Sequence, residues 1–254
     1  LEAKNVISLE IKALQKLKKN INDSFNKAVI QISKCQSKVI LCGVGKSGLI
    51  AAKIASTMSS VGSPSFSLSA NDCLHGDLGS ITKKDILILI SNSGKSEELI
   101  PIIKFANRNK IKLIGIVSKK NSILYKASDI KVLLPQVNEA EGIIPTSSTT
   151  TQLALGDAIA ITAMKYKKFG KLDFKKLHPS GSLSKKLKTV EDLMITKNKI
   201  PFVNENINLD KGIKIINRKK LGVVITKNSK NLTTGIVTDG DIKRLIQKHR
   251  NFKE

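Results

Sequence analysis

Three short stretches of the sequence contain the groups that could bind a phosphate. Residues 43–48, GVGKSG, and residues 91–98, SNSGKSEE, each end an apolar run and precede a helical pattern. Residues 146–151, TSSTTT, open a further helical pattern. Hydroxyl groups and free backbone N–H groups at the positive end of a helix bind anions. Each cluster alone could simply cap its helix, but together they favour a site for one phosphate on a small molecule.

The glycine-rich stretch does not match the triphosphate loop, G-x-x-x-x-G-K-[ST]. Its first glycine is replaced by Ile40 before one GKS and by Leu89 before the other. The dinucleotide pattern does fit Gly43, Gly45 and Gly48. However, the second predicted strand, SFSLS, ends without the acidic residue that would bind a ribose. A nicotinamide-dependent oxidoreductase therefore stays a weaker alternative.

Ionisable side chains accompany these stretches. Lys46 lies in the first, Glu98 closes the second, and Glu139 lies in the irregular stretch VNEAEGII. His75 lies in NDCLHGDLGS and His178 in LHPSGS. The ends of parallel strands are where α/β proteins bind ligands. A lysine, carboxylates and an imidazole beside a sugar phosphate could move a proton next to a carbonyl group.

The elements that must position these residues follow an α/β pattern. Short runs of Val, Ile and Leu alternate with helical patterns, which predicts a doubly wound parallel sheet covered on both faces. Besides SFSLS at residues 65–69, the predicted strands cover residues 38–42, 85–91, 112–118 and 129–135. The predicted helices cover residues 6–35, 47–60, 96–110 and 146–170. A basic linker follows, broken by Pro179 and Gly181, and then a smaller α+β module. We expect domains at 1–182 and 183–254.

Composition limits the partners. The net charge is +24, but only four of the 44 basic residues are arginine and the lysines are spread along the chain. This pattern favours the steering of anionic substrates over nucleic-acid binding. Three cysteines without CxxC spacing predict neither a disulfide framework nor a zinc site. No apolar run approaches the roughly 18–20 residues of a membrane span, so we expect a soluble protein. The cysteine pattern fits a reducing cytoplasm.

The ordered motifs resemble one known family. GVGKSG, HGDLG, ISNSGKSEE, PTSSTTTQLALGDAIA and HPSGSLSKKL together resemble the D-arabinose 5-phosphate isomerases, which carry a sugar isomerase (SIS) domain followed by CBS domains. The resemblance implies interconversion of D-ribulose 5-phosphate and D-arabinose 5-phosphate through an enediol, for Kdo of lipopolysaccharide or for capsule. It implies no cofactor and no metal. It also implies a homotetramer with active sites shared between subunits.

The resemblance also assigns roles to residues. Lys46 would neutralise phosphate or polarise an oxygen, and Glu98 or Glu139 would be the enediol base. His178 would assist ring opening or carry a proton, including in the pocket of a neighbouring protomer. The residues expected to bind the sugar phosphate are Gly45, Ser47, His75, Ser91, Ser93, Ser96, Thr146, Ser147 and Ser148.

Two departures and one alternative accompany the resemblance. Lys95 stands where the family usually has an acidic residue, and the loop after Glu139 is about two residues shorter than expected. GIVTDGDIKRL resembles the end of a single or truncated CBS module, in which Thr238 and Asp241 match nucleotide-contacting positions. The alternative is a non-catalytic, sugar-phosphate-sensing SIS regulator. About 37 residues precede the first predicted strand, too few for the DNA-binding domain of such regulators.

Overall fold

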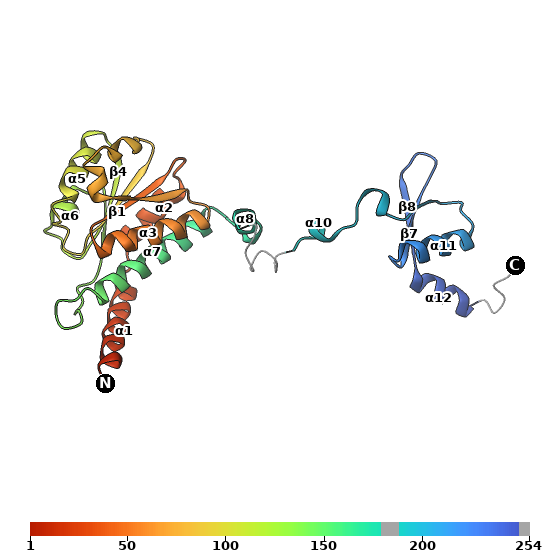
Figure 1. Ribbon diagram of the computed structural model, residues 1–254, viewed down its shortest axis with the longest axis horizontal. Helices are drawn as coiled ribbons and strands as arrows, with labels where there is room; N and C mark the ends of the chain where they lie inside the picture. The colour runs from red at the N-terminus through yellow and green to blue at the C-terminus, as the bar shows by residue number, and fades with distance from the viewer. Residues whose placement is uncertain (179–187, 249–254) are drawn as a thin grey trace. The chain divides into compact units, whose positions relative to one another are not determined.

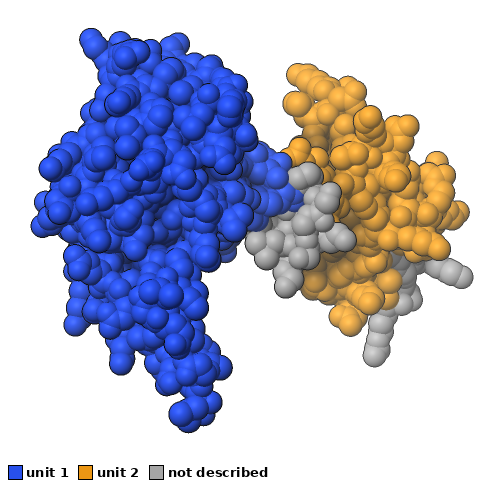
Figure 2. All heavy atoms as spheres, turned by 60° about the vertical axis from the view of Figure 1, so that its left-hand side comes forward, with its two compact units in different colours: residues 1–187 blue, residues 188–254 orange. Residues whose placement is uncertain are grey.

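The computed structural model describes residues 1–178 and 188–248, and the chain divides into two compact units. Unit 1 covers residues 1–187 and unit 2 covers residues 188–254 (Figure 2). The boundary predicted at 182–183 lies outside the described residues. Each unit is therefore considered by itself.

Unit 1 contains the predicted parallel sheet. Its five strands lie in the order β2-β1-β3-β4-β5, and every neighbouring pair is parallel. The strands are β1 (Val39–Gly43), β2 (Ser65–Ser69), β3 (Ile86–Ile90), β4 (Lys112–Val117) and β5 (Ile130–Leu133). β1 and β3 are buried along their whole length. This burial explains their apolar sequences, because helices cover both faces of the sheet.

Helices form a layer on each face (Figure 1). One layer shares a core with Leu41 and Ile88, and the other shares a core with Leu87 and Leu89. The first layer contains α1 (Glu2–Asn20), α2 (Asp23–Ser33), α3 (Lys46–Ser60) and α7 (Ser147–Tyr166). The second contains α4 (Ala70–Cys73), α5 (Leu99–Arg108) and α6 (Ile123–Ala127), and η1 (Asp77–Ser80) follows α4. Alternate residues of a strand point to opposite faces, so one strand serves both cores.

The chain reverses its winding between β1 and β3. From β1 the chain passes through α3 to β2 on one side, whereas β3, β4 and β5 lie on the other side. Gly43 at the end of β1 is in register with Ile90 at the end of β3. The loops that follow these two strands therefore start side by side at the carboxyl edge. In open α/β sheets this switch point is the usual ligand site.

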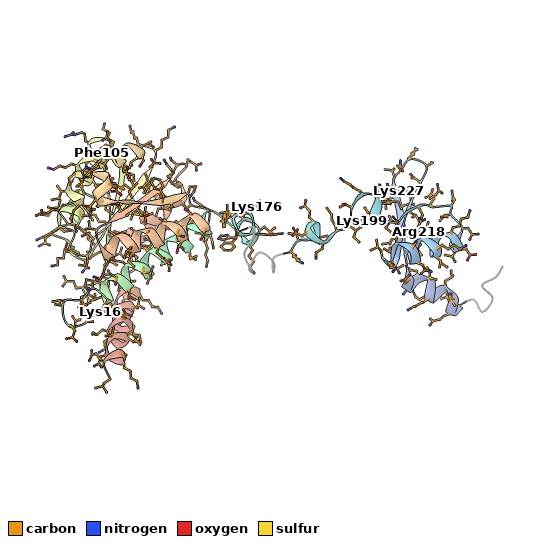
Figure 3. The ribbon with its side chains drawn as sticks, in the orientation of Figure 1. Lys16, Phe105, Lys176, Lys199, Arg218 and Lys227 are labelled. Atoms are coloured by element: carbon orange, nitrogen blue, oxygen red, sulfur yellow. The ribbon has the colours of Figure 1, made fainter. Side chains whose placement is uncertain are left out.

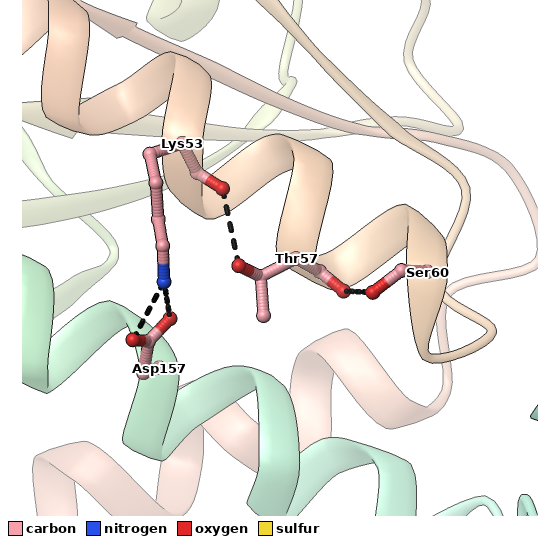
Figure 4. A network of polar contacts seen from close by, with 4 residues as sticks. All are labelled: Lys53, Thr57, Ser60 and Asp157. Atoms are coloured by element: carbon pink, nitrogen blue, oxygen red, sulfur yellow. Dashed lines mark hydrogen bonds and ion pairs between the residues drawn. The ribbon is translucent and has the colours of Figure 1, made fainter. Parts of the chain in front are cut away.

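α3 and α7 run in the same direction across the first face. A Cβ on Gly156 of α7 would lie 2.2 Å from Ile54 Cδ1 of α3, so the helices touch there. Lys53 Nζ lies 2.6 Å from both carboxylate oxygens of Asp157, as Figure 4 shows, with Thr57 and Ser60 along the same helix. Both helices begin at the carboxyl edge of the sheet.

The end of α7 lies at the opposite, amino edge. Lys167 Nζ donates to the carbonyl oxygen of Gly62, which precedes β2, at 3.1 Å. The helix α8 (Lys171–Leu177) follows α7. In Figure 3, Lys176 marks α8 beyond one end of α7, whereas Lys16 of α1 lies towards the other end. Lys16 Nζ donates to Gln136 O, which follows β5 at the carboxyl edge.

Unit 2 is the predicted small α+β module. Its strands are β6 (Phe202–Asn204), β7 (Val223–Lys227) and β8 (Thr233–Thr238), with β6 parallel and β8 antiparallel to β7. The other elements are α10 (Val190–Leu193), η2 (Lys197–Lys199), α11 (Leu209–Lys219) and α12 (Asp239–Lys248). Its core is small: Val203, Ile216, Val224 and Ile242. In either described part, no helix combines the length and apolar character that a membrane crossing needs.

Candidate functional site

The turn after β1 brings the backbone tightly into α3. Gly45 has φ +57°, and a Cβ on Gly43 would lie 2.8 Å from the carbonyl carbon and oxygen of Ser47. A Cβ on Gly48 would lie 2.8 Å from Gly43 O. These glycines are therefore required by the turn itself. The N-cap residue Gly45 makes no side-chain cap hydrogen bond, so the positive start of the helix is open beside the exposed Lys46.

The turn after β3 is held by its own serines. Ser91 Oγ accepts from Gly94 N at 3.0 Å and lies 3.1 Å from Ser96 Oγ. Ser93 Oγ accepts from Lys95 N at 3.3 Å. This turn delays the helix that the sequence predicts from residue 96, and α5 begins at residue 99. These hydrogen bonds fix the turn, and with it the three serine hydroxyls, without any bound ligand.

Glu139 caps α7. Its Oε2 accepts from Thr146 N at 2.9 Å and from Ser148 N at 3.2 Å, while Thr146 Oγ1 accepts from Ala140 N at 3.2 Å. A carboxylate in this position complements the positive end of the helix. Oε1 has no hydrogen-bond partner in residues 1–178 or 188–248. The predicted catalytic glutamate thus has one oxygen fixed and the other available.

The three predicted stretches meet at the carboxyl edge. Lys46 and Ser148 each lie eight residues before the contact between Ile54 and Gly156. Because both helices rise 1.5 Å per residue, their starts lie at the same level. Glu98, the N-cap of α5, follows the neighbouring turn. Neither Lys46 nor Glu98 has an ion pair within the part of the chain that the structure describes.

A pocket of about 330 Å³ lies beside the first turn. Gly45 lines one side, and Ser67, Ser69 and Asn71 line the other. Its volume is at the small end of the range for ligand pockets. His75 follows shortly after Asn71 and is exposed, but it does not line the pocket.

Two thiols lie close in sequence to residues that line this pocket. Cys42 precedes Gly43 and Cys73 follows shortly after Asn71, and both thiols are buried in one hydrophobic cluster. The interaction with Cys73 and then burial raise the pKa of the Cys42 thiol, whereas the interaction with Cys42 lowers the pKa of Cys73. All three cysteines have free thiols.

His178 lies far from this edge within one chain. Its Nδ1 is 2.9 Å from Phe174 O, and its ring stacks on Phe174 with centroids 3.8 Å apart. It follows α8, beyond the amino-edge end of α7. The 20 residues of α7 span about 30 Å. A single chain therefore does not bring His178 together with Lys46, Glu98 and Glu139.

Comparison with known proteins identifies the two units. Residues 31–162 match the SIS domain, and residues 190–248 match the CBS domain. The chain is 40% identical over 246 residues to arabinose 5-phosphate isomerase KdsD of Yersinia pestis, covering 96% of this chain and 75% of that one. KdsD of Francisella tularensis is 41% identical over 245 residues, covering 94% and 75%. The chain belongs to the arabinose 5-phosphate isomerase family.

A solved structure supports the same family at the level of fold. The c3406 protein of E. coli CFT073, in complex with arabinose 5-phosphate, has a TM-score of 0.67 and 36% identity, covering 70% of this chain and 95% of that one. A putative phosphosugar isomerase involved in capsule formation from Bacteroides fragilis has a TM-score of 0.66 and 33% identity, covering 69% and 95%. The predicted fold, a SIS sheet followed by a smaller CBS module, is confirmed.

The CBS residues expected to contact a ligand bind each other. Asp241 Oδ2 accepts from Thr238 N at 2.9 Å and from Thr238 Oγ1 at 2.7 Å, and Arg244 pairs with Asp241. These hydrogen bonds, first that from the Thr238 hydroxyl, lower the pKa of Asp241 to about 2. The two residues cap α12, and ligand binding there stays a prediction.

One residue beside the candidate site was missed in the sequence analysis. Gln152 of α7 is 1% exposed, and neither amide atom has a hydrogen-bond partner among the described residues. The signal was present in TTTQLALGDAIA, where a glutamine interrupts the apolar positions of the helix. It lies one turn after Ser148, whose N–H binds Glu139.

Proposed function

We propose that this protein interconverts D-ribulose 5-phosphate and D-arabinose 5-phosphate, supplying the precursor of Kdo for lipopolysaccharide or capsule. The observation that carries the proposal is the meeting of two Gly-Lys-Ser turns at the β1/β3 switch point. The start of α7 lies at the same edge, and the chain belongs to the arabinose 5-phosphate isomerase family. The reaction takes place in the cytoplasm, where the free thiols of the chain persist.

The phosphate binds where hydroxyls and helix starts converge. The open start of α3 and the side chain of Lys46 provide positive charge. The expected hydroxyl and backbone donors are those of Gly45, Ser47, Ser91, Ser93, Ser96, Thr146, Ser147 and Ser148. His75 lies near the pocket beside β2 and contacts the sugar.

The reaction needs a base but no net oxidation. A carboxylate removes a proton from C1 of the ketose while the C2 carbonyl oxygen takes up a proton, which gives the enediol. A proton then returns to C2 and the O1 hydroxyl loses its proton, which gives the aldose. Glu139 is the base, because two N–H groups hold it in one position and leave Oε1 for the substrate. Glu98, whose side chain has no ion pair in residues 1–178 or 188–248, is the second carboxylate.

The working enzyme is a homotetramer with shared sites. His178 follows α7, which ends at the amino edge of its own sheet, so His178 serves the site of a neighbouring protomer. Large apolar side chains on the outside of α1 and α7 support such contacts: Ile7 is 56% exposed, Ile11 50% and Ile161 41%. A tetramer of this kind covers these side chains.

Mixing inactive variants tests the shared site. Lys46→Ala and His178→Ala proteins are unfolded together, refolded as mixed oligomers and assayed. If one site takes Lys46 and His178 from different protomers, mixed oligomers contain some complete sites and regain activity. If both residues come from one protomer, the mixture stays as inactive as its components.

Direct turnover tests the reaction itself. The folded protein is incubated with D-ribulose 5-phosphate, and D-arabinose 5-phosphate is measured as product. Lys46→Ala should reduce kcat/KM at least about 100-fold, because charge stabilisation at a reacting centre is worth that much. Lys119→Ala, another exposed lysine after a strand, is the matched control and should retain activity. Saturable binding without turnover would favour the sugar-phosphate-sensing regulator instead.

A further inference from the structure

Three residues in the described parts carry buried polar side-chain atoms without a hydrogen-bond partner. They are Ser63, Ser147 and Gln152. Ser147 and Gln152 both lie in the first six residues of α7, whereas Ser63 precedes β2 at the amino edge. Burying an amide without hydrogen-bond partners lowers the stability of the fold, and an apolar residue at the same position would avoid that cost. Gln152 is the largest such group and the only one with two unmatched polar atoms in these parts of the chain.

Gln152 lies on the side of α7 that faces α3. It precedes Gly156 by four residues, so the two share one face of the helix, and Gly156 touches Ile54 of α3. Ile50 precedes Ile54 by the same interval, which places Gln152 level with Ile50. Long side chains in helices lean towards the N-terminus. The amide of Gln152 is therefore directed towards the level where α3 and α7 begin.

The neighbouring groups at this level belong to the substrate site. Ser148, one turn before Gln152, donates its N–H to Glu139, and it is 2% exposed. Ser47 lies in the first turn of α3 opposite. The Gln152 amide can both donate and accept, so it suits a buried water molecule, which needs two to four polar partners. A water bound to this amide lies within reach of the substrate site.

We propose that Gln152 is a positioning residue for the isomerase reaction. Its amide holds an ordered water at the base of the site, and this water hydrogen-bonds to the bound sugar phosphate. The inference rests on the proposed function, because it takes the sugar phosphate as the ligand. Water-mediated contacts of this kind contribute to binding almost as direct hydrogen bonds do. Gln152 does not titrate, so it changes binding and leaves the pH profile of the reaction unaltered.

The test uses Gln152→Met, which keeps the length of the side chain and removes its polar atoms. We expect Tm to stay the same or to rise by a few degrees, because an apolar group replaces a buried amide that lacks hydrogen-bond partners. We expect KM for D-ribulose 5-phosphate to rise about tenfold with kcat little changed, because binding energy common to ground and transition states is lost. Gln152→Leu provides a second apolar replacement if the first folds poorly.

Ser63→Ala is the matched control. It removes another buried hydroxyl that has no partner within the described residues, at the opposite edge of the sheet, so it should affect Tm alone. A folded Gln152 variant whose KM and kcat match those of the wild type overturns the proposal, whatever its Tm. So does a crystal structure of the wild type with D-arabinose 5-phosphate in which no water joins the amide to the ligand.

The two proposals fail separately. If the folded wild-type protein does not convert D-ribulose 5-phosphate, the proposed function fails before any variant is compared. Protection against thermal unfolding by D-arabinose 5-phosphate is then measured for the wild type and for Gln152→Met. Equal protection of the two proteins refutes the positioning role independently of turnover.

Discussion

Glu139→Gln separates two roles that the structure gives to one carboxylate. Glu139 caps α7 through two backbone N–H groups, at 2.9 Å from Thr146 N and 3.2 Å from Ser148 N. It is also the proposed enediol base. Glutamine has nearly the same shape and keeps an oxygen that accepts from the helix. However, it carries no charge and cannot take a proton from carbon.

The two roles predict effects of different size. Loss of a cap costs about 0.5–2 kcal/mol, and loss of a charge at a helix start costs about 0.3–1 kcal/mol. Since the glutamine oxygen keeps part of the cap, we expect the free energy of unfolding to fall by about 1–2 kcal/mol. For a domain of this size, that lowers Tm by roughly 2–8 °C. Loss of a general base reduces kcat by about 10²–10⁴-fold.

The assay measures kcat at 25 °C, well below Tm, together with thermal unfolding of the same protein. The control is Glu141→Gln, an exposed glutamate two residues away in the same loop, which should change neither quantity. Glu139→Gln with a lower Tm but a kcat within threefold of the control would refute the base assignment. Glu139 would then be a helix cap, and Glu98 would remain as the base to test.

Two further predictions concern the scaffold of the site. Gly94→Ala should lower the free energy of unfolding, measured in urea, by more than about 2 kcal/mol, because Gly94 has φ +64° and the added Cβ would lie 2.3 Å from Ser122 Oγ. The control Gly79→Ala should be nearly neutral in the same assay, because a Cβ there meets nothing within 4 Å. Burial raises the pKa of Asp85, but the hydroxyl and N–H groups that donate to it outweigh burial and hold its pKa below the usual value. Its stabilisation is therefore complete above the unfolded-state pKa of about 4 and is lost as pH falls through the lower folded-state value. Asp85→Asn should cost about 1–3 kcal/mol at pH 7, and a difference from wild type that does not shrink below about pH 4 would contradict this account.

The sheet could be predicted because its signal is local. Four of the five strands consist mainly of Val, Ile and Leu, and such runs occur where both faces of a parallel sheet are covered. The start of α5 was predicted less well. Ser91 and Ser96 hydrogen-bond across the turn at Gly94, and α5 therefore begins three residues later than the sequence predicts. Helical periodicity carries no information on such hydroxyl contacts.

Candidate site residues could be proposed from the sequence, but their geometry could not be predicted. Glu139 lies seven residues before Thr146, and no helical or strand spacing predicts that its carboxylate folds back onto the start of α7. Gln152 was overlooked for a related reason. A single polar residue in an apolar helix is usually explained by exposure, and only the packing of α7 against α3 shows that this one is buried.

The length of α7 explains why one chain cannot complete the proposed site. The helix begins beside Glu139 at the carboxyl edge and ends beside Gly62 at the amino edge. The chain after α7 therefore starts at the edge of the sheet opposite to Lys46. His178 comes only eight residues after Gly170, and seven of the residues between form α8. A helix rises 1.5 Å per residue, so this segment adds about 10 Å, against the roughly 30 Å that α7 has crossed. A catalytic role for His178 therefore requires the sheet of a second protomer beside the end of α7, and it links activity to assembly.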